Sequence, residues 1–180
     1  MRRLLIAAAV AIATLSGVAA YQHEQARPGG AHWRETAWPF PRDGWPAGRA
    51  FRCDVAACGA EVELYVRPKI GFCNCDSGVA DDDEVDRVAD LDLVSDRFVP
   101  RAAGQVVQLD GMSGRSRSYD LRMADGSKRR AVGFALSRRC DLMVAVVQGE
   151  GSAASAQRAA LDFLGTDPMA HWMMSALDGG

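Results

Sequence analysis

Two strand-like segments joined by an Asp-Gly pair constrain the fold more than any other feature of the chain. The segment SYDLRMADGSKRRAVGFAL contains Asp125-Gly126 between two runs of strand-forming residues. Asp-Gly is a strong signal for a tight hairpin because both positions tolerate positive φ. We therefore expect an antiparallel pair whose second strand buries one face through Val132, Phe134 and Leu136.

Two further segments extend this pair into a sheet. The run 142–147 is apolar at every position, which is typical of a central strand that is buried on both faces. Residues 61–66 alternate between polar and apolar types, the period expected of a half-buried strand. A mainly antiparallel sheet follows from these patterns.

Three segments have helical patterns. Asp81 can cap a helix over 81–94, and Glu84 lies three residues further on, where negative charge suits a helix N-terminus. Two more helical patterns cover about 153–164 and 167–177. The sequence therefore predicts an α+β domain, with one internal helix and two C-terminal helices packed against the sheet.

The first twenty residues have the layout of a secretory signal peptide. Arg2 and Arg3 precede an apolar run, and small residues end at Ala20, where a signal peptidase would cleave. The run is too short to span a bilayer as an anchor, which needs about 20 residues. The paired arginines also fit a twin-arginine signal, although the polar context of that signal is missing. We expect a periplasmic or extracellular protein with no transmembrane segment after cleavage.

Residues 21–49 are expected to form an irregular arm, and residues 50–180 a single domain. The arm contains Trp33, Trp38 and Trp45 among several prolines, which restrict φ and remove backbone donors. The tryptophans either pack over the sheet or form an exposed binding loop. Packing is favoured because three exposed tryptophans would form a large apolar patch.

Five cysteines are candidates for disulfides or for a metal site, and four of them lie close together in the sequence. They are Cys53, Cys58, Cys73, Cys75 and Cys140. Disulfides persist outside the cytoplasm. A bond between Cys73 and Cys75 would close a very small ring, so we expect each to find another partner, with Cys53 and Cys58 the nearest in sequence. Cys140 is either a buried free thiol or a partner for one of the four, so several two-bridge patterns remain open.

The alternative is a metal site, most simply zinc, held by the four clustered cysteines. The Cys-Gly at 58–59 resembles a zinc knuckle, but the second pair has one intervening residue where such knuckles usually have two or more. A redox site is disfavoured because the chain has no C-x-x-C motif. The last helix contains His171 and several methionines, which resemble a copper site, although their spacing fits a core stripe better.

Charge is distributed unevenly along the chain. Residues 81–96 contain eight acids and one base, in an order that does not match a calcium loop. Residues 115–139 contain eight bases and two acids. Without the signal peptide, 19 basic residues face 23 acidic residues, so nucleic-acid binding is not expected. The candidate residues for binding an anionic ligand or partner are Lys128, Arg129, Arg130, Arg138 and Arg139.

The chain lacks the sequence motifs of the common enzyme classes. Arg115 replaces the second glycine of a nucleophile elbow in the segment around Ser113, and neither H-E-x-x-H nor a phosphate-binding glycine loop is present. We therefore expect an exported, disulfide-stabilised domain that is not an enzyme and that binds an envelope partner or a small ligand. The first alternative is a metal-binding protein, and a hydrolase of unrecognised type comes after it.

Overall fold

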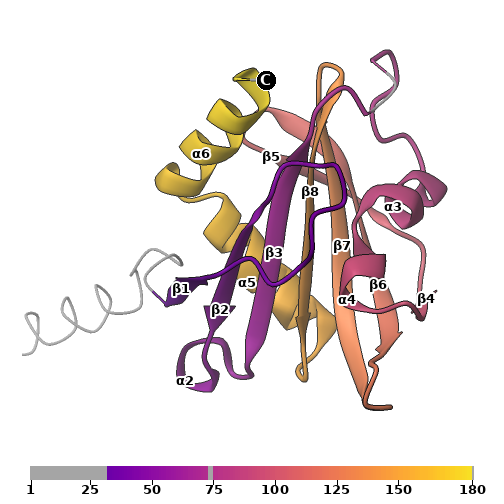
Figure 1. Cartoon of the computed structure of the whole chain (residues 1–180), viewed down its shortest axis with the longest axis vertical. Helices are drawn as coiled ribbons and strands as arrows, with labels where there is room; N and C mark the ends of the chain where they lie inside the picture. The colour runs from indigo at the N-terminus through magenta and orange to yellow at the C-terminus, as the bar shows by residue number, and fades with distance from the viewer. Residues whose placement is uncertain (1–31, 73–74, 180) are drawn as a thin grey trace, which may run out of the picture.

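The computed structural model describes residues 32–72 and 75–179, which form one antiparallel sheet of eight strands with five helices (Figure 1). The prediction of an α+β fold with an antiparallel sheet is confirmed. The strands are β1 (Trp33–Thr36), β2 (Arg49–Cys53), β3 (Val62–Lys69), β4 (Phe98–Pro100), β5 (Gln105–Leu109), β6 (Met112–Arg122), β7 (Lys128–Arg138) and β8 (Asp141–Gly149). The helices are α2 (Val55–Cys58), α3 (Asp82–Val88), α4 (Leu91–Val94), α5 (Ala153–Leu164) and α6 (Asp167–Asp178).

The order of the strands across the sheet is β1-β2-β3-β8-β7-β6-β4, and β5 pairs with β6 beside β4. Strand β8 lies between β3 and β7 and is buried from Leu142 to Gly149, so the run 142–147 forms a central strand. Within the described ranges, no helix is long and apolar enough to cross a membrane. The predicted signal peptide, residues 1–20, lies outside the described residues.

The hairpin between β6 and β7 closes with a loop of three residues, 124–126, between the hydrogen-bonded residues Met123 and Ser127. The Asp-Gly pair indicates a tighter turn. The amide of Met123 donates to the carbonyl of Ser127, and the amide of Gly126 donates to the carbonyl of Met123, both at 2.9 Å. Gly126 is the one residue of this loop with positive φ, at 83°. A type I turn followed by a left-handed glycine commonly closes such loops. The resulting register places Arg122 opposite Lys128.

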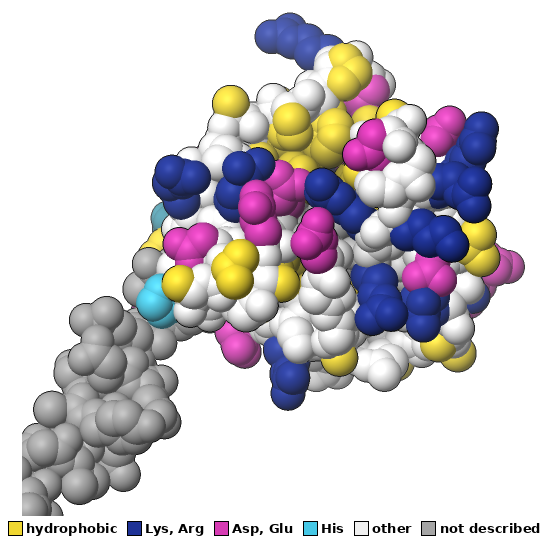
Figure 2. All heavy atoms as spheres, turned by 90° about the horizontal axis from the view of Figure 1, so that it is seen from below, with side chains coloured by type: hydrophobic (Ala, Val, Ile, Leu, Met, Phe, Trp, Pro, Cys, Tyr) yellow, Lys and Arg dark blue, Asp and Glu magenta, His cyan; other side chains and the backbone are white. Residues whose placement is uncertain are grey.

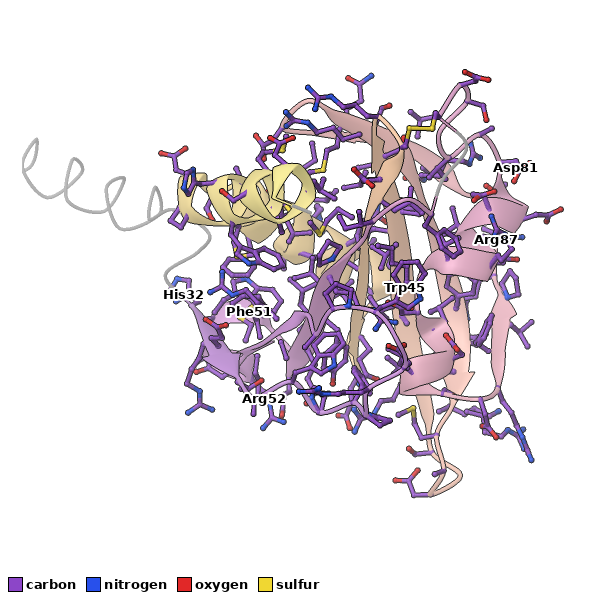
Figure 3. All side chains as sticks on the ribbon, turned by 45° about the horizontal axis from the view of Figure 1, so that its top comes forward. His32, Trp45, Phe51, Arg52, Asp81 and Arg87 are labelled. Carbon is purple, nitrogen blue, oxygen red and sulfur yellow. A yellow bond between two sulfur atoms is a disulfide. The ribbon has the colours of Figure 1, made fainter. Side chains whose placement is uncertain are left out.

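Helices α5 and α6 cover one face of the sheet. The Ser152 side chain caps α5 by accepting from the amide of Ser155 at 3.1 Å. Phe51 lies between the sheet and these helices (Figure 3) and packs edge-on against Phe163. The core under the helices includes Leu64, Val66, Val132, Phe134, Leu136, Val147, Ala160, Met169 and Met173. The methionines of the last helix thus include two core residues, and His171 is exposed.

Helices α3 and α4 and the segment 37–48 cover the other face. The helix predicted over 81–94 is wrong in its extent, because two short helices replace it. Asp81 caps the first by accepting from the amide of Glu84 at 2.9 Å, as the sequence indicates. The helix then breaks at Asp90, whose φ is 61°. This left-handed position turns the Asp90 carboxylate toward two buried cations on β3.

In the described part of the arm, one segment forms a strand, and the tryptophans pack against the rest of the domain. Residues 33–36, predicted to be irregular, form β1, which pairs with β2 at the edge of the sheet. Trp33 stacks on Phe163 of α5, with ring centroids 5.1 Å apart. Trp38 packs edge-on against Tyr65 of β3, and Trp45 lies over the sheet on the side of α3 (Figure 3). The tryptophans are therefore part of the packed domain.

A buried ion cluster fastens the segment 37–48 to β3. Arg67 is 3% exposed at its side chain and donates to both carboxylate oxygens of Asp43, at 2.9 and 2.7 Å. It also bonds both oxygens of Asp90, and Lys69 bonds Asp90 at 2.6 Å. Burial opposes the charge on Arg67, but its bonds to Asp90 and Asp43 outweigh that effect and raise its pKa. The Arg67 guanidinium lies over the ring of Trp38, and the Lys69 ammonium lies over the ring of Trp45.

The cluster predicts an acid-sensitive contribution to stability. The hydrogen bonds from Arg67 lower the pKa of Asp43 to about 2. A carboxylate with a lowered pKa stabilises the fold above its unfolded pKa of about 3.9, and this contribution is lost as the pH falls to 2. We expect Asp43→Asn to unfold more easily than the wild type at pH 6, with the gap closing between pH 4 and pH 2. Urea unfolding across this range measures it, and a constant gap would contradict it.

Candidate functional site

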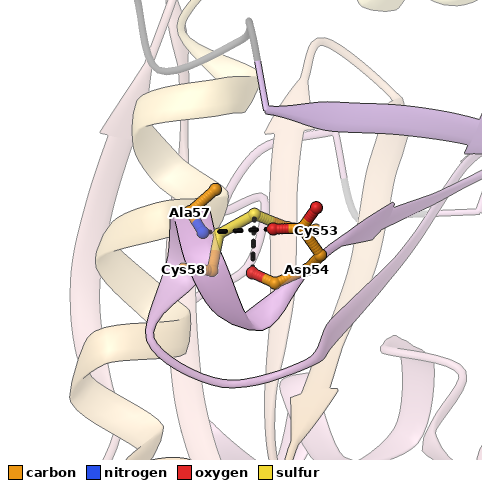
Figure 4. Close-up of a disulfide and its surroundings, with 4 residues drawn as sticks. All are labelled: Cys53, Asp54, Ala57 and Cys58. Carbon is orange, nitrogen blue, oxygen red and sulfur yellow. Dashed lines mark hydrogen bonds between the residues drawn. A yellow bond between two sulfur atoms is a disulfide. The ribbon is translucent and has the colours of Figure 1, made fainter.

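The described cysteines form two disulfides in different parts of the molecule. Cys53 at the end of β2 bonds Cys58 at the end of α2, with Cα atoms 6.1 Å apart (Figure 4). Asp54 caps the short helix between them by accepting from the amide of Ala57 at 3.1 Å. Cys75 bonds Cys140, 65 residues away in sequence. Of the pairings that the sequence left open, the structure therefore joins Cys75 to Cys140 and not to Cys53 or Cys58, which are nearer in sequence.

This arrangement does not support the zinc alternative. Cys53 and Cys58 are bonded to each other, Cys75 is bonded to a residue outside the clustered four, and Cys73 lies outside the described residues. A sulfur in a disulfide is not the thiolate that zinc requires. Among the residues that the structure describes, no group of three or more His, Cys, Asp or Glu side chains is placed to hold a metal ion.

Many of the charged residues identified in the sequence pair with one another. Two acids of α3 face two bases of β6: Asp82 accepts from Arg115, and Asp86 accepts from Arg117, both at 2.7 Å. The hydroxyl of Tyr119 also donates to Asp86 at 2.6 Å, and burial together with this carboxylate raises the tyrosine pKa. These pairs hold α3 on the sheet and leave these bases unavailable for a ligand.

Arg138 and Arg139 are also engaged, at a site far from the hairpin turn. Both contact Asp178 at the end of α6, at 3.2 and 3.8 Å. They lie at the opposite end of β7 from Lys128, and ten residues of strand span roughly 34 Å. The five candidate bases therefore do not form one site, and this pair is separated from the other three.

Four bases near the hairpin turn form what we call the basic corner. They are Arg97, Arg122, Lys128 and Arg130. All four are exposed, and within the described part of the chain their side chains form no ion pair or hydrogen bond. The register places them on the same face as Val132, which belongs to the core under α5. The corner is thus a part of this face that the helices leave uncovered.

Three of these cations stand in one row across the sheet. Arg122 pairs with Lys128 on β7, and its amide donates to the carbonyl of Arg97 just before β4, at 2.9 Å. Side chains directly opposite on neighbouring strands have Cβ atoms about 5 Å apart, and like charges there are destabilising. Arg130 lies two residues further along β7 on the same face. The fold thus concentrates positive charge at this point, and none of these side chains forms an ion pair with a described residue.

A hollow of about 720 Å³ lies at the corner. Six bases line it, the four of the corner together with Arg101 and Arg129, against the two acids Asp120 and Glu150. Arg101 holds both oxygens of Asp120, at 2.7 and 2.9 Å, and Arg129 lies 3.7 Å from Glu63. Figure 2 shows this end of the molecule, with Lys and Arg side chains gathered on its right side.

The structure thus brings together three of the five candidate bases with three that sequence analysis missed. Lys128, Arg129 and Arg130 line the hollow, although Arg129 extends toward Glu63. Arg97, Arg101 and Arg122 were not identified as candidates. The signal for Arg122 was present in the hairpin, whose register sets it opposite Lys128. Nothing in the sequence places the short strand β4 beside β6.

Comparisons with known proteins do not indicate a function. No family model matches the chain, and no curated protein matches it. A crystal structure of a protein of unknown function, PA94 from Pseudomonas aeruginosa, is similar at a TM-score of 0.41 and 13% sequence identity. The similarity covers 82% of this chain and 96% of that one.

Proposed function

We propose that this protein is an exported, disulfide-stabilised domain that is not an enzyme and that binds an anionic ligand at the basic corner. Two disulfides suit an oxidising compartment outside the cytoplasm. The first twenty residues have the composition of a cleavable signal peptide. The hollow at the corner, at about 720 Å³, has the size of common small-molecule sites.

The row of unpaired cations carries the proposal. The same chain pairs Arg115 and Arg117 with carboxylates, so it has acidic residues that neutralise bases elsewhere. At the corner it instead sets Arg97, Arg122 and Lys128 opposite one another. A local arrangement that costs stability without an internal compensation is expected at a functional site. An anion bound over the row supplies that compensation.

Binding at such a site depends on electrostatics in an exposed setting. One charge pair about 6 Å apart in water contributes about 0.7 kcal/mol, so several cations must act together to give useful affinity. The affinity is expected to fall with added salt, because salt screens exposed charges beyond about 10 Å at 0.1 M.

Charge reversal in the middle of the row tests this proposal with two opposite readouts. In Arg122→Glu, the new carboxylate lies between Arg97 and Lys128 and pairs with both. We expect the free energy of unfolding to rise by about 0.5–1 kcal/mol. We also expect pyrophosphate, measured by titration calorimetry at low salt, to bind at least about tenfold more weakly.

The matched control is Arg34→Glu, which makes the same charge change on β1 at the opposite edge of the sheet. Arg34 is exposed, and its side chain forms no ion pair with the described residues. This variant should bind pyrophosphate within about twofold of the wild type. The proposal fails if pyrophosphate does not bind the wild type, or if both variants lose affinity equally. Because the Arg122 variant is expected to be the more stable one, unfolding cannot explain its loss of binding.

A further inference from the structure

We infer that the ligand of the basic corner carries two phosphate groups, joined by a spacer of about the size of a sugar. This inference rests on the proposed function and specifies the chemistry of the same site. The charge balance of the hollow, the positions of the four unpaired cations and the number of donors that they offer lead to it.

The charge balance requires more than one phosphate. Six bases and two acids line the hollow, which leaves a net charge of +4. Four of these bases, the cations of the corner, have no side-chain partner among the described residues. A phosphate monoester carries a charge of about −1.5 to −2 at pH 7, so two such groups balance the site and one leaves half of it uncompensated.

The four cations divide by position into two pairs. Arg97 and Arg122 are direct neighbours across the β4–β6 pairing, and Lys128 and Arg130 lie two residues apart on one face of β7. Neighbouring strands are about 4.8 Å apart, and alternate residues of a strand are about 7 Å apart. One anionic group can therefore sit over each pair, with the two groups separated by roughly one to two strand spacings.

The type of donor favours phosphate over carboxylate. A carboxylate has two oxygens in a plane, and a single guanidinium fork satisfies both, as Arg67 does for Asp43. Phosphate has three acceptor oxygens in a tetrahedral arrangement and can accept from two or three side chains at once. Three of the four free cations are arginines, the side chain that is most common where phosphate is bound by several donors. Val99 is 65% exposed and lies beside the row, where it can contact the carbon atoms of a spacer.

The pairing of Arg101 with Asp120 keeps the site available. Asp120 lies directly opposite Arg130, which it would neutralise if it were free. Arg101 instead bonds both of its oxygens. Asp120 is the one acid that β4, β6 and β7 contribute to the hollow. The Asp120→Asn variant removes this negative charge and releases Arg101 as a further cation. We therefore expect it to bind bisphosphates at least about threefold more tightly.

The test compares soluble probes by titration calorimetry on the purified protein. Fructose 1,6-bisphosphate is expected to bind at least tenfold more tightly than fructose 6-phosphate or the dicarboxylate adipate, because its second phosphate binds intramolecularly. Asp120→Asn should strengthen binding of the bisphosphate, and Lys128→Ala should weaken it at least threefold. Arg34→Ala is the control and should leave the affinity unchanged.

A second set of measurements identifies the source of the phosphates. Cosedimentation with phosphatidylcholine vesicles that contain phosphatidylinositol 4-phosphate, whose inositol ring joins a phosphodiester to a phosphomonoester, tests for two phosphates displayed on a membrane. If these vesicles compete with fructose 1,6-bisphosphate and bind more tightly per phosphate, the ligand is a phosphorylated lipid headgroup. If they do not bind while the bisphosphate does, the ligand is a soluble bisphosphate. Both results support two-phosphate recognition.

The outcomes separate this inference from the proposed function. If fructose 6-phosphate or adipate binds as tightly as the bisphosphate, the inference is overturned while anion binding at the corner stands. The same holds if Asp120→Asn weakens binding while the thermal midpoint is unchanged. If none of the anions binds the wild type, the proposed function itself fails.

Discussion

Replacing both Cys75 and Cys140 by alanine is expected to lower the free energy of unfolding by about 4 kcal/mol. The disulfide joins residues 65 positions apart, so it removes a large loop-closure entropy from the unfolded chain, and a loop of this length corresponds to about 4 kcal/mol in the chain-entropy description. It ties the loop after β3 to the turn between β7 and β8. Urea unfolding followed by circular dichroism measures the loss.

The second disulfide provides the matched control. Cys53 and Cys58 are only five positions apart in sequence. For so short a loop, the same description gives a stabilisation of about 2 kcal/mol. Cys53 is fully buried, so its replacement by alanine also removes some packing, which makes the comparison conservative. If the Cys53→Ala/Cys58→Ala variant is the less stable of the two, loop closure is not what the longer bridge contributes.

The pairing of Cys140 illustrates what sequence analysis could not supply. Proximity along the chain favours partners within the cluster of four cysteines, whereas the sheet order decides the pairing. Strands β3 and β8 are neighbours, with Lys69 opposite Leu142. The end of β3 and the start of β8 therefore lie together, and the segments that continue from them carry Cys75 and Cys140. A contact of this kind follows from topology, which the pattern of apolar residues does not determine.

The elements of the fold were predictable where local patterns were strong. The alternation at 61–66, the fully apolar run 142–147 and the Asp81 cap all correspond to described elements. Short pieces such as β1 and β4 were not predictable, because three or four residues carry no periodicity and are strands only through their neighbours. The break at Asp90 was missed because its cause lies on β3, not in the helix sequence.

The candidate site was likewise predictable only where a local pattern in the sequence was strong. The density of bases near the hairpin identified Lys128 and Arg130, and the charge count alone could not tell them from Arg138, which pairs with Asp178. The three-residue hairpin loop matters here, since a shift of one residue would move every side chain of the shifted strand to the other face of the sheet. Arg97 joins the row only through the pairing of β4 with β6.

Asp90→Asn is expected to lower the free energy of unfolding by about 3–5 kcal/mol. Its carboxylate is the shared partner of Arg67 and Lys69, whose side chains are 3% and 7% exposed. Removing one member of a buried ion cluster leaves uncompensated charge in the interior, and this costs about 3–5 kcal/mol. Asparagine tolerates the left-handed backbone at this position, so the variant changes the charge and keeps the conformation. Urea unfolding at pH 7 measures the effect.

Asp92→Asn is the matched control, because it makes the same chemical change two residues away on the exposed side of α4. A surface substitution of this kind is expected to stay within about 0.5 kcal/mol of the wild type. Asp43→Asn should fall between the two, since Asp43 is 31% exposed and Arg67 keeps Asp90 as a partner. Equal stabilities for the Asp90 and Asp92 variants would show that the two cations on β3 do not depend on Asp90. The segment 37–48 would then be held on the sheet by its aromatic side chains and not by the ion cluster.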